Sequence, residues 1–330
     1  MKLNNQIIKQ LKKEGYRIVG NHSAVKICRW TKKSLRNEGE CYKSQFYGIN
    51  TNRCCQISCS LLNCQNKCIH CWRDLKYTCS DEIKNPDSIN SIIEGCIKEQ
   101  RKLLEGFKIL PETKHKTLSK VNMKKWQEAQ LPTQFAISLT GEGTLYSKIG
   151  ELISELRKRG NTSFLVTNGL YPEKIKELEK KKQLPTQLYV SVNSPNKKIY
   201  NEFHRSSKKN AWEKLNETLK LISKLKSKTR TVIRLNLVRE LNMNEKYIKE
   251  YAKLIKKATP LFLELKGYMA VGHARERLGY ERMPTDKEME DFAKKISKET
   301  GLKILDKHEF SRVLVLGKNK KDLKIKKKEI

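Results

Sequence analysis

The chain has 330 residues and a formal net charge of +34, from 70 Lys and Arg against 36 Asp and Glu. This length permits one large or two small domains, and the charge favours a polyanionic partner such as nucleic acid. No stretch approaches the roughly eighteen apolar residues of a membrane helix, and the N-terminus lacks the apolar core of a secretory signal. We therefore expect no membrane partner and a cytoplasmic location, where thiols stay reduced.

All ten cysteines lie within the first 96 residues, and all of them follow a short helix expected near residues 5–14. Clustered thiols in a reducing compartment indicate metal binding or catalysis rather than a disulfide framework. Cys28, Cys41 and Cys54 follow one another with twelve residues between each pair. They are candidate ligands of an iron–sulfur cluster. Ordinary buried thiols are the alternative, and Cys55 is as good a candidate as its neighbour Cys54.

A compact cysteine motif follows the first expected strand, residues 56–62. Its spacing is Cys-x3-Cys-x2-Cys, formed by Cys64, Cys68 and Cys71. Three thiolates can hold three irons of a 4Fe–4S cube and leave the fourth iron open, and open metal positions belong to catalytic sites. A zinc site is the alternative. Zinc modules, however, usually bind the ion with four ligands from two Cys or His pairs, and only one compact group of cysteines is present here.

This spacing is the signature of the radical S-adenosylmethionine enzymes, which the chain resembles. The resemblance implies a partial (β/α)6 barrel of the α/β class. It also implies that the open iron binds the amino and carboxylate groups of S-adenosylmethionine, whose reductive cleavage gives a 5′-deoxyadenosyl radical. One residue departs from the family pattern: His70 precedes the third cysteine, where the family usually has an aromatic residue.

Buried strands and helices alternate along the rest of the chain. Short apolar runs rich in β-branched residues are separated by Lys- and Glu-rich stretches of helical period, which indicates parallel βαβ units. Six units result if the strand before the cysteine motif is included. The strands are expected over residues 56–62, 135–139, 162–167, 188–192, 232–238 and 261–265, and the helices over 146–158, 172–182, 212–225, 243–258 and 285–299.

Glycines and small polar residues follow these strands, where parallel barrels gather their functional groups. After the second strand, Gly141, Glu142 and Gly143 match the family's Gly-Gly-Glu-Pro-like motif, with Gly143 in place of proline. The resemblance implies that the backbone at Gly141 and the Glu142 carboxylate bind the cofactor's amino group. Residues after the third and fourth strands would bind its ribose and carboxylate: Thr167, Asn168, Ser191 and Asn193. Without the family, Asn168 and Gly169 are a common turn pair.

Two later sequence motifs make the resemblance specific to one family of radical enzymes. They are Lys266-Gly-Tyr-Met after the sixth strand and Phe310-Ser-Arg-Val near the C-terminus. Together with the spacing of both cysteine groups and the Gly141-Glu142 motif, they resemble the 4-demethylwyosine synthases, of the archaeal type, over about residues 25–317.

This narrower resemblance implies two substrates: tRNA-Phe with N1-methylguanosine just 3′ of its anticodon, and pyruvate. It implies S-adenosylmethionine and two 4Fe–4S clusters as cofactors. The adenosyl radical would take a hydrogen from the N1-methyl group, and the carbon radical would add to pyruvate, which loses its carboxyl group as the tricyclic base closes. Lys43 would hold pyruvate as a Schiff base. Chelation of pyruvate by the open iron of the second cluster is the alternative.

The remaining expectations concern domains and partners. Residues 1–55 would form an extension with the second cluster, 56–317 the barrel, and 318–330 a basic tail. The chain begins too near its first cysteines for the flavodoxin-like domain of some relatives, which implies an external ferredoxin or flavodoxin. Residues 101–125 carry eight Lys or Arg before Trp126, a candidate platform for stacking RNA bases.

Simpler interpretations remain open for the charge and for the activity. An A/T-rich genome would produce part of the lysine excess, and the tail, with seven lysines between residues 318 and 328, can be a solvated extension. A different radical enzyme and a non-enzymatic, zinc-bearing RNA-binding module are the two rival classes.

Overall fold

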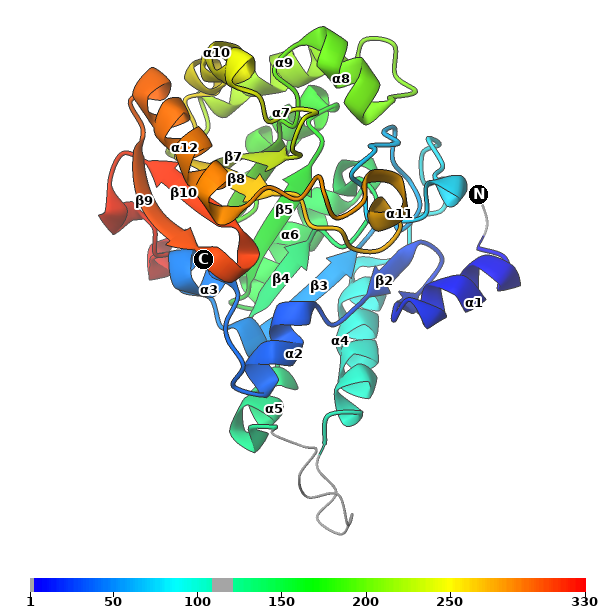
Figure 1. Ribbon diagram of the computed structural model, residues 1–330. Coiled ribbons are helices and arrows are strands. Elements are labelled where there is room, and N and C mark those ends of the chain that lie inside the picture. The colour runs from blue at the N-terminus through cyan, green and yellow to red at the C-terminus, as the bar shows by residue number, and fades with distance from the viewer. Residues whose placement is uncertain (1–2, 109–120) are drawn as a thin grey trace. The chain divides into compact units, whose positions relative to one another are not determined.

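The computed structural model describes residues 3–108 and 121–330, and the chain divides into two compact units (Figure 1). Unit 1 comprises Met1–Leu62, Glu82–Leu165 and Lys324–Ile330, and unit 2 comprises Asn63–Asp81 and Val166–Leu323. The expected boundaries after residues 55 and 317 do not coincide with this division. Within the described ranges, no helix is long and apolar enough to cross a membrane.

Unit 1 is built on three parallel strands, β3, β4 and β5, extended by an antiparallel pair, β1 and β2, at the β3 edge. The parallel strands match the expected ones, although the first begins and ends a few residues earlier than predicted. The antiparallel pair was not predicted, because strands of three residues are too short to show an alternating pattern. The strands are β1 (Arg17–Val19), β2 (Ser23–Val25), β3 (Cys54–Ser58), β4 (Gln134–Ile137) and β5 (Thr162–Thr167), the last of which ends in unit 2.

The helices of unit 1 cover this sheet and carry several of its cysteines. The longest, α4, packs against β1, β2 and β3 (Figure 1) and buries one face that includes Ile92, Cys96 and Leu104. Ser88 caps its N-terminus by accepting a hydrogen bond from the Ser91 amide at 3.2 Å. The helices are α1 (Asn5–Lys13), α2 (Arg29–Leu35), α3 (Tyr42–Tyr47), α4 (Ile89–Glu105), α5 (Met123–Ala129) and α6 (Ile149–Lys158).

Unit 2 contains a second set of parallel strands, β6, β7 and β8, followed by an antiparallel hairpin that places β10 beside β8 and β9 at the edge. The parallel strands confirm the predicted alternation, whereas the hairpin is an addition that the sequence did not predict. The result is an open, mixed sheet. The strands are β6 (Gln187–Ser191), β7 (Arg230–Leu237), β8 (Phe262–Gly267), β9 (Lys303–His308) and β10 (Val313–Gly317).

Helices of unit 2 connect the parallel strands as expected. The last of them, α12, packs against β8, β9 and β10. It begins with a capping box between Thr285 and Glu288 and ends at Gly301, whose φ of +73° suits glycine. The helices are α7 (Pro172–Lys180), α8 (Lys197–His204), α9 (Ala211–Ile222), α10 (Ile248–Ala258), α11 (Ala274–Leu278) and α12 (Asp286–Thr300).

The C-terminal segment is folded rather than a solvated extension. In unit 2, Leu323 is buried, and its carbonyl accepts a hydrogen bond from the Arg230 guanidinium at 2.6 Å. In unit 1, the Lys324 ammonium donates to the Gln45 carbonyl, and the Ile325 amide donates to the Tyr47 carbonyl. Removing the segment would therefore disturb the fold as well as the charge.

Trp126 is a packing residue in this structure. Its indole N–H donates to the Leu104 carbonyl at 2.8 Å. The ring packs against four buried residues, namely Ile27, Leu35, Leu104 and Ala129. The predicted role as a stacking platform for RNA is therefore unsupported at this position. Residues 109–120 of the predicted basic segment lie outside the described residues.

Candidate functional site

The three clustered cysteines lie on an irregular loop of unit 2, Asn63–Asp81, which we call the cysteine loop. Its backbone is held by hydrogen bonds to its own far end and to the end of α8. The N–H groups of Cys64, Lys67 and Ile69 donate to the carbonyls of Cys79 (2.8 Å), His204 (2.9 Å) and Phe203 (3.0 Å), respectively. The loop is therefore fixed by partners that are distant in the sequence.

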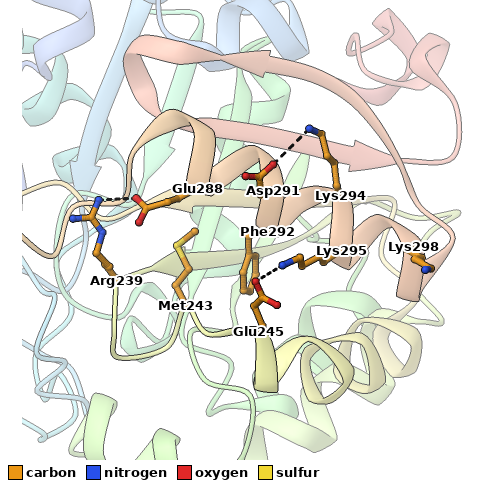
Figure 2. A pocket seen from close by; sticks show the side chains of 9 residues that line it. All are labelled: Arg239, Met243, Glu245, Glu288, Asp291, Phe292, Lys294, Lys295 and Lys298. Carbon is orange, nitrogen blue, oxygen red and sulfur yellow. Dashed lines mark hydrogen bonds and ion pairs between the residues drawn. The ribbon is translucent and has the colours of Figure 1, made fainter.

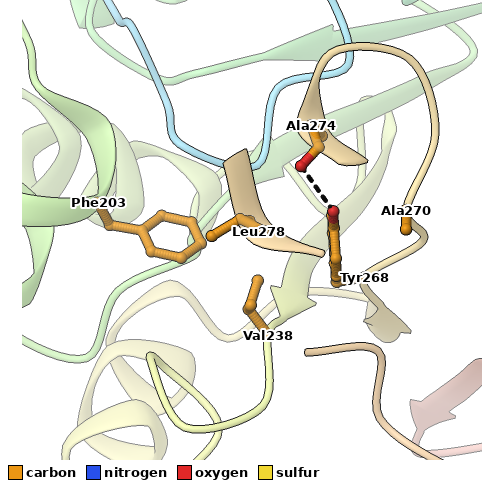
Figure 3. Packing of buried hydrophobic residues seen from close by; sticks show 6 residues of the cluster. All are labelled: Phe203, Val238, Tyr268, Ala270, Ala274 and Leu278. Atoms are coloured by element: carbon orange, nitrogen blue, oxygen red, sulfur yellow. Dashed lines mark hydrogen bonds between the residues drawn. The ribbon is translucent and has the colours of Figure 1, made fainter. Parts of the chain in front are cut away.

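An apolar cluster lies beneath the loop (Figure 3). Ile69 packs against it, and the Tyr268 hydroxyl closes it by donating to the Ala274 carbonyl at 2.9 Å. Its buried members are Phe203, Val238, Tyr268, Ala270, Ala274 and Leu278. From α11, the Arg277 guanidinium donates to the carbonyls of Ile69 (3.0 Å) and Cys71. Packing and hydrogen bonding thus hold the same short stretch of the loop.

One buried cation, Arg73, lies among the three thiols of the cysteine loop. Burial raises the pKa of Cys68 well above its usual range, and the neighbouring Cys64 and Cys71 thiols raise it further. Arg73 is 7% exposed; burial would lower its pKa, but the three cysteines raise it overall. The three thiols therefore share one buried cation, which partly offsets the cost of burying negative charge.

The chemistry of these donors suits a cluster with one open position. In a 4Fe–4S cube each cysteine thiolate binds one iron. The three thiols of Cys64, Cys68 and Cys71 would therefore hold three irons and leave the fourth iron open.

Two neutral histidines complete the surroundings of the loop. The His70 ring stacks on Phe203, with 4.8 Å between ring centroids, and burial lowers its pKa to about 4. A neutral ring stacked on an apolar one therefore lies directly before Cys71. The His204 Nδ1 lies 3.1 Å from the Cys68 Sγ, and burial lowers the pKa of His204 to about 3. A neutral imidazole beside a thiolate can only donate at this contact.

Sequence reasoning missed His204, Arg73 and Arg277. His204 is 136 residues from Cys68, and Arg277 is 208 residues from Ile69. A lone histidine in a helix and two arginines among 70 basic residues carry no sequence signal.

Asn168 is the predicted residue nearest to the clustered thiols. Its Nδ2 lies 3.9 Å from the Cys64 Sγ, while its Oδ1 accepts from the Leu170 amide at 3.0 Å. The Thr167 hydroxyl accepts from the Gly169 amide at 3.1 Å. The turn after β5 is therefore organised by these two side chains, and Asn168 brings it to the cysteine loop.

Asn193 links the end of β6 to both β7 and the loop. Its Oδ1 accepts from the Asn236 amide at 2.8 Å, and its Nδ2 lies 3.4 Å from the His70 Nε2. Ser191, the last residue of β6, is half-buried. Asn193 thus has a positioning role, and Ser191 is the least buried residue of the same strand.

The predicted Gly141-Glu142 motif lies in unit 1, where backbone geometry explains its residues. Gly141 has a φ of +73°, and a Cβ there would meet the Ser60 carbonyl oxygen at 1.8 Å, so only glycine fits. Glu142 is 2% exposed, and its Oε1 accepts from the Thr144 amide (3.2 Å) and hydroxyl (2.7 Å). The motif therefore presents a buried carboxylate in a fixed orientation.

The three more widely spaced cysteines also lie in unit 1, each at the start of an element. Cys28 caps α2, and its Sγ accepts from the Thr31 amide at 3.3 Å. Cys41 caps α3, and its Sγ accepts from the Lys43 amide at 3.5 Å. Such amides stabilise a thiolate, because the first turn of a helix carries unsatisfied donors.

Cys54, at the start of β3, faces the same group. Burial raises its pKa most, Cys28 and Cys41 raise it further, and Lys43 lowers it. Cys55 is fully buried, and the thiol that most affects its pKa is Cys96. The charges that act on Cys54, and not those that act on Cys55, are therefore those of Cys28 and Cys41.

Lys43 is 9% exposed, and its Nζ lies 5.0 Å from the centre of the Phe164 ring. It is therefore unusual among the lysines of this chain, because most of them are solvated. A largely buried lysine is a candidate for covalent chemistry, because loss of solvent favours the neutral amine that can attack a carbonyl.

The cavity shown in Figure 2 is separate from the cysteines. It measures about 500 Å³ and is lined by residues of α12 and of the segment after β7. Its acidic residues are paired with cations: Glu288 with Arg239 (2.6 Å), Asp291 with Lys294 (3.6 Å), and Glu245 with Lys295. With its acidic residues all paired, the cavity lacks the convergent reactive groups of an active site.

Comparison with known proteins agrees with this geometry. Residues 61–255 match the Radical SAM superfamily, and residues 257–318 match the family described as wyosine base formation. The S-adenosyl-L-methionine-dependent tRNA 4-demethylwyosine synthase of Pyrococcus horikoshii is 43% identical over 96% of this chain and 90% of its own length. The corresponding protein of Methanocaldococcus jannaschii is 37% identical over 94% of this chain and 95% of its own.

A solved structure of TYW1 with a lysine-pyruvate adduct bound superimposes with a TM-score of 0.83 at 35% identity, covering 98% of both chains. The predicted fold class is therefore confirmed as that of the radical S-adenosylmethionine enzymes. The chain belongs to the family of S-adenosylmethionine-dependent tRNA 4-demethylwyosine synthases, enzymes that use S-adenosylmethionine and a 4Fe–4S cluster.

Proposed function

We propose that this chain condenses N1-methylguanosine, just 3′ of the anticodon of tRNA-Phe, with pyruvate to form 4-demethylwyosine. The observation that carries the proposal is the presence of two separate cysteine groups, one on the anchored loop of unit 2 and one beside Lys43 in unit 1. The first group accounts for the radical chemistry, and the second is where we place the activation of pyruvate. Membership of the family supports the tRNA substrate.

In this proposal Cys64, Cys68 and Cys71 hold the first 4Fe–4S cluster, and Arg73 balances its charge. With S-adenosylmethionine bound, that cluster supplies a 5′-deoxyadenosyl radical able to take a hydrogen from the N1-methyl group. Glu142, with the backbone at Gly141, would accept the cofactor's ammonium group. The other predicted residues would contact its ribose and carboxylate: Thr167, Asn168, Ser191 and Asn193.

We assign a second 4Fe–4S cluster to Cys28, Cys41 and Cys54, and the pyruvate to Lys43. The neutral amine would attack the C2 carbonyl of pyruvate, and loss of water would give an imine that holds the substrate in place. The lysine-pyruvate adduct named for the solved relative supports this assignment. Sodium borohydride should trap pyruvate on wild-type protein and not on Lys43→Ala. Trapping by both proteins, or an undiminished product yield from Lys43→Ala, would favour chelation of pyruvate by the cluster.

The remaining partners follow from the same chemistry. Each turnover needs an electron, for which we propose an external ferredoxin or flavodoxin in the cytoplasm. We also propose three functional segments: an extension with the second cluster (1–55), the radical S-adenosylmethionine core (56–317) and a basic tail (318–330). These segments differ from the two compact units of the fold.

An anaerobic turnover assay tests the whole proposal. Reconstituted protein would be mixed with dithionite, S-adenosylmethionine, pyruvate and a tRNA transcript methylated at guanosine N1, and the nucleosides analysed by mass. We expect a tricyclic base containing two pyruvate carbons. Formation of 5′-deoxyadenosine without a modified base would indicate a radical enzyme with another substrate. If neither appears from iron-loaded protein, the enzymatic proposal fails; zinc in place of iron in anaerobically purified protein would favour a binding module.

A further inference from the structure

Two sequence motifs that the proposed chemistry does not use lie together at the end of β8 in unit 2. They are the segments around Lys266 and Arg312. The Gly267 amide donates to the Arg312 carbonyl at 2.8 Å, and the Lys266 Nζ donates to the Ser311 carbonyl at 3.4 Å. A Cβ on Gly267 would lie only 3.2 Å from the Arg312 Cβ. Glycine thus allows the two segments to approach closely.

This strand end is near the cysteine loop. Tyr268, two residues after Lys266, belongs to the apolar cluster on which Ile69 packs (Figure 3). Its amide donates to the Leu237 carbonyl at the end of β7. A ligand held at Lys266 would therefore lie at the same edge of unit 2 as the candidate radical chemistry.

The positive charge of Arg312 is available to a ligand. Arg312 is half-buried, and within the described part of the chain no carboxylate pairs with its guanidinium. Lys266, also half-buried, donates to the Ser311 carbonyl, which precedes Arg312 in the chain. This strand end therefore favours an anion beside Arg312.

Two further features mark the segment as a binding site. Arg312 has a φ of +49°, an uncommon backbone conformation for a residue other than glycine, and such strain is concentrated at functional sites. The Ser311 hydroxyl is buried and has no hydrogen-bond partner in the described structure. A buried hydroxyl left unpaired is costly unless a ligand or water supplies its partner.

Phe310 indicates which kind of anion is bound. Its side chain is 80% exposed, although it immediately precedes the buried Ser311. Small carboxylates need no aromatic surface, whereas proteins that bind single-stranded RNA combine cations for phosphates with exposed rings on which bases stack. The combination of ring, hydroxyl and two cations therefore matches a nucleotide.

We propose that Lys266, Ser311 and Arg312 bind a backbone phosphate of the tRNA loop and that Phe310 stacks on an adjacent base. The inference rests on the proposed tRNA substrate and adds to it the surface that holds the nucleotide beside the reacting one. Binding of this neighbouring nucleotide would explain how the tRNA loop is held while its methylated base is unstacked.

The test is the affinity of the full-length protein for the methylated tRNA transcript, measured by fluorescence anisotropy across a salt series. Phe310→Ala should weaken binding about tenfold without changing the salt dependence, and Phe310→Trp should restore it, because stacking involves no phosphate. Arg312→Gln should weaken binding and reduce the salt slope by about one, because one phosphate contact is lost. Arg312→Lys should keep the wild-type slope.

Matched controls separate these effects from general losses of apolar surface or charge. Leu131 is 61% exposed in unit 1, and Lys294 lies on the rim of the cavity in Figure 2. Leu131→Ala and Lys294→Gln should bind within about twofold of wild type. Because Phe310 is exposed, its variants should also keep the wild-type thermal midpoint.

Two outcomes would contradict the proposed binding site without contradicting the proposed tRNA substrate. One is wild-type affinity and slope in both Phe310→Ala and Arg312→Gln. The other is a higher KM for pyruvate or S-adenosylmethionine with unchanged tRNA affinity, because the anion would then be a small carboxylate. Failure of the wild-type protein to bind the transcript would instead remove the tRNA substrate itself, and the site with it.

Discussion

The two cysteine groups of this protein are assembled in opposite ways. On the cysteine loop, three thiols come from eight consecutive residues, and distant backbone groups then fix the loop. In unit 1, the three thiols come from the starts of two helices and a strand, and the fold itself brings them together. Local spacing therefore predicts the first group, whereas only a folded unit 1 creates the second.

The difference also concerns charge. The loop thiols share the buried cation Arg73, while the thiols of unit 1 have Lys43 and the amides of helix N-termini. An arginine keeps its charge, whereas a lysine that attacks pyruvate must be neutral, and amides offer only partial charges. We therefore expect the first group to keep its thiolates, and hence its cluster, more firmly than the second.

The largest expected effect comes from removing one thiol of each group. Cys68→Ala should abolish formation of 5′-deoxyadenosine, because the cluster that supplies the electron loses a ligand. Cys54→Ala should still form 5′-deoxyadenosine but no tricyclic base, and should retain about four of eight irons. Cys55→Ala is the matched control and should keep both clusters. Full iron content in Cys54→Ala, or its loss in Cys55→Ala, would mean that the second group has been wrongly assigned.

Substitution of Gly141 tests whether the close approach of its backbone to the Ser60 carbonyl matters for stability. Gly141→Ala should destabilise the protein by about 3 kcal/mol or more, because it combines a positive φ with overlap of the Ser60 carbonyl. Gly160→Ala shares the positive φ, +69°, but meets nothing within 4 Å, so it should cost only about 1–2 kcal/mol. Urea unfolding of the apo-proteins measures both. Equal losses would show that the contact with Ser60 is unimportant.

Arg277 tests the anchoring of the cysteine loop. Arg277→Ala removes two charge-assisted hydrogen bonds to loop carbonyls, and we expect iron to be released to a chelator about tenfold faster. Arg275, two residues earlier, is exposed and contacts only the Tyr280 hydroxyl at 3.4 Å among its described hydrogen bonds. Arg275→Ala should therefore release iron at the wild-type rate. Similar rates for the two variants would indicate that packing alone holds the loop.

The smallest effect concerns thiols outside both groups. Burial raises the pKa of Cys59 to about 12 and that of Cys96 also above its usual range. At pH 9 both should resist iodoacetamide in the folded apo-protein and react in urea, whereas Cys28 should react in both. Because their folded pKa exceeds the unfolded value of about 8.5, the folded state retains protons, and its stability should fall as pH rises above about 8.5. Ready labelling of native Cys59 would contradict this.

Much of the architecture could be predicted from local patterns. The six parallel strands and five of the helices follow from alternating apolar runs, and each lies within a few residues of its expected position. The short strands β1 and β2 and the hairpin of β9 and β10 escaped prediction, since three-residue strands and a polar edge strand lack a distinct period. Helix α8 was also missed, although it provides His204.

The site was predictable to the extent that its residues follow strands or share a motif. The prediction of Cys64, Cys68 and Cys71 as ligands needed only their spacing, and Asn168, predicted to contact the cofactor, lies 3.9 Å from the Cys64 Sγ. The choice between Cys54 and Cys55 needed the pleat of β3, which turns neighbouring side chains to opposite faces. Partners from distant elements, such as Arg277, cannot be inferred without the fold.

The cysteine loop also determines when this protein becomes competent to receive its first cluster. The chain enters unit 2 at Asn63 and returns to unit 1 at Glu82, yet the groups that hold the loop are translated much later. On the ribosome, Cys64 to Cys71 emerge before His204, and well before Arg277, has been synthesised. On the nascent chain the loop therefore lacks these hydrogen-bond partners. We expect iron to be loaded only when the protein is nearly complete. Delivery of the cluster would then be timed by the end of translation and not by the appearance of its ligands.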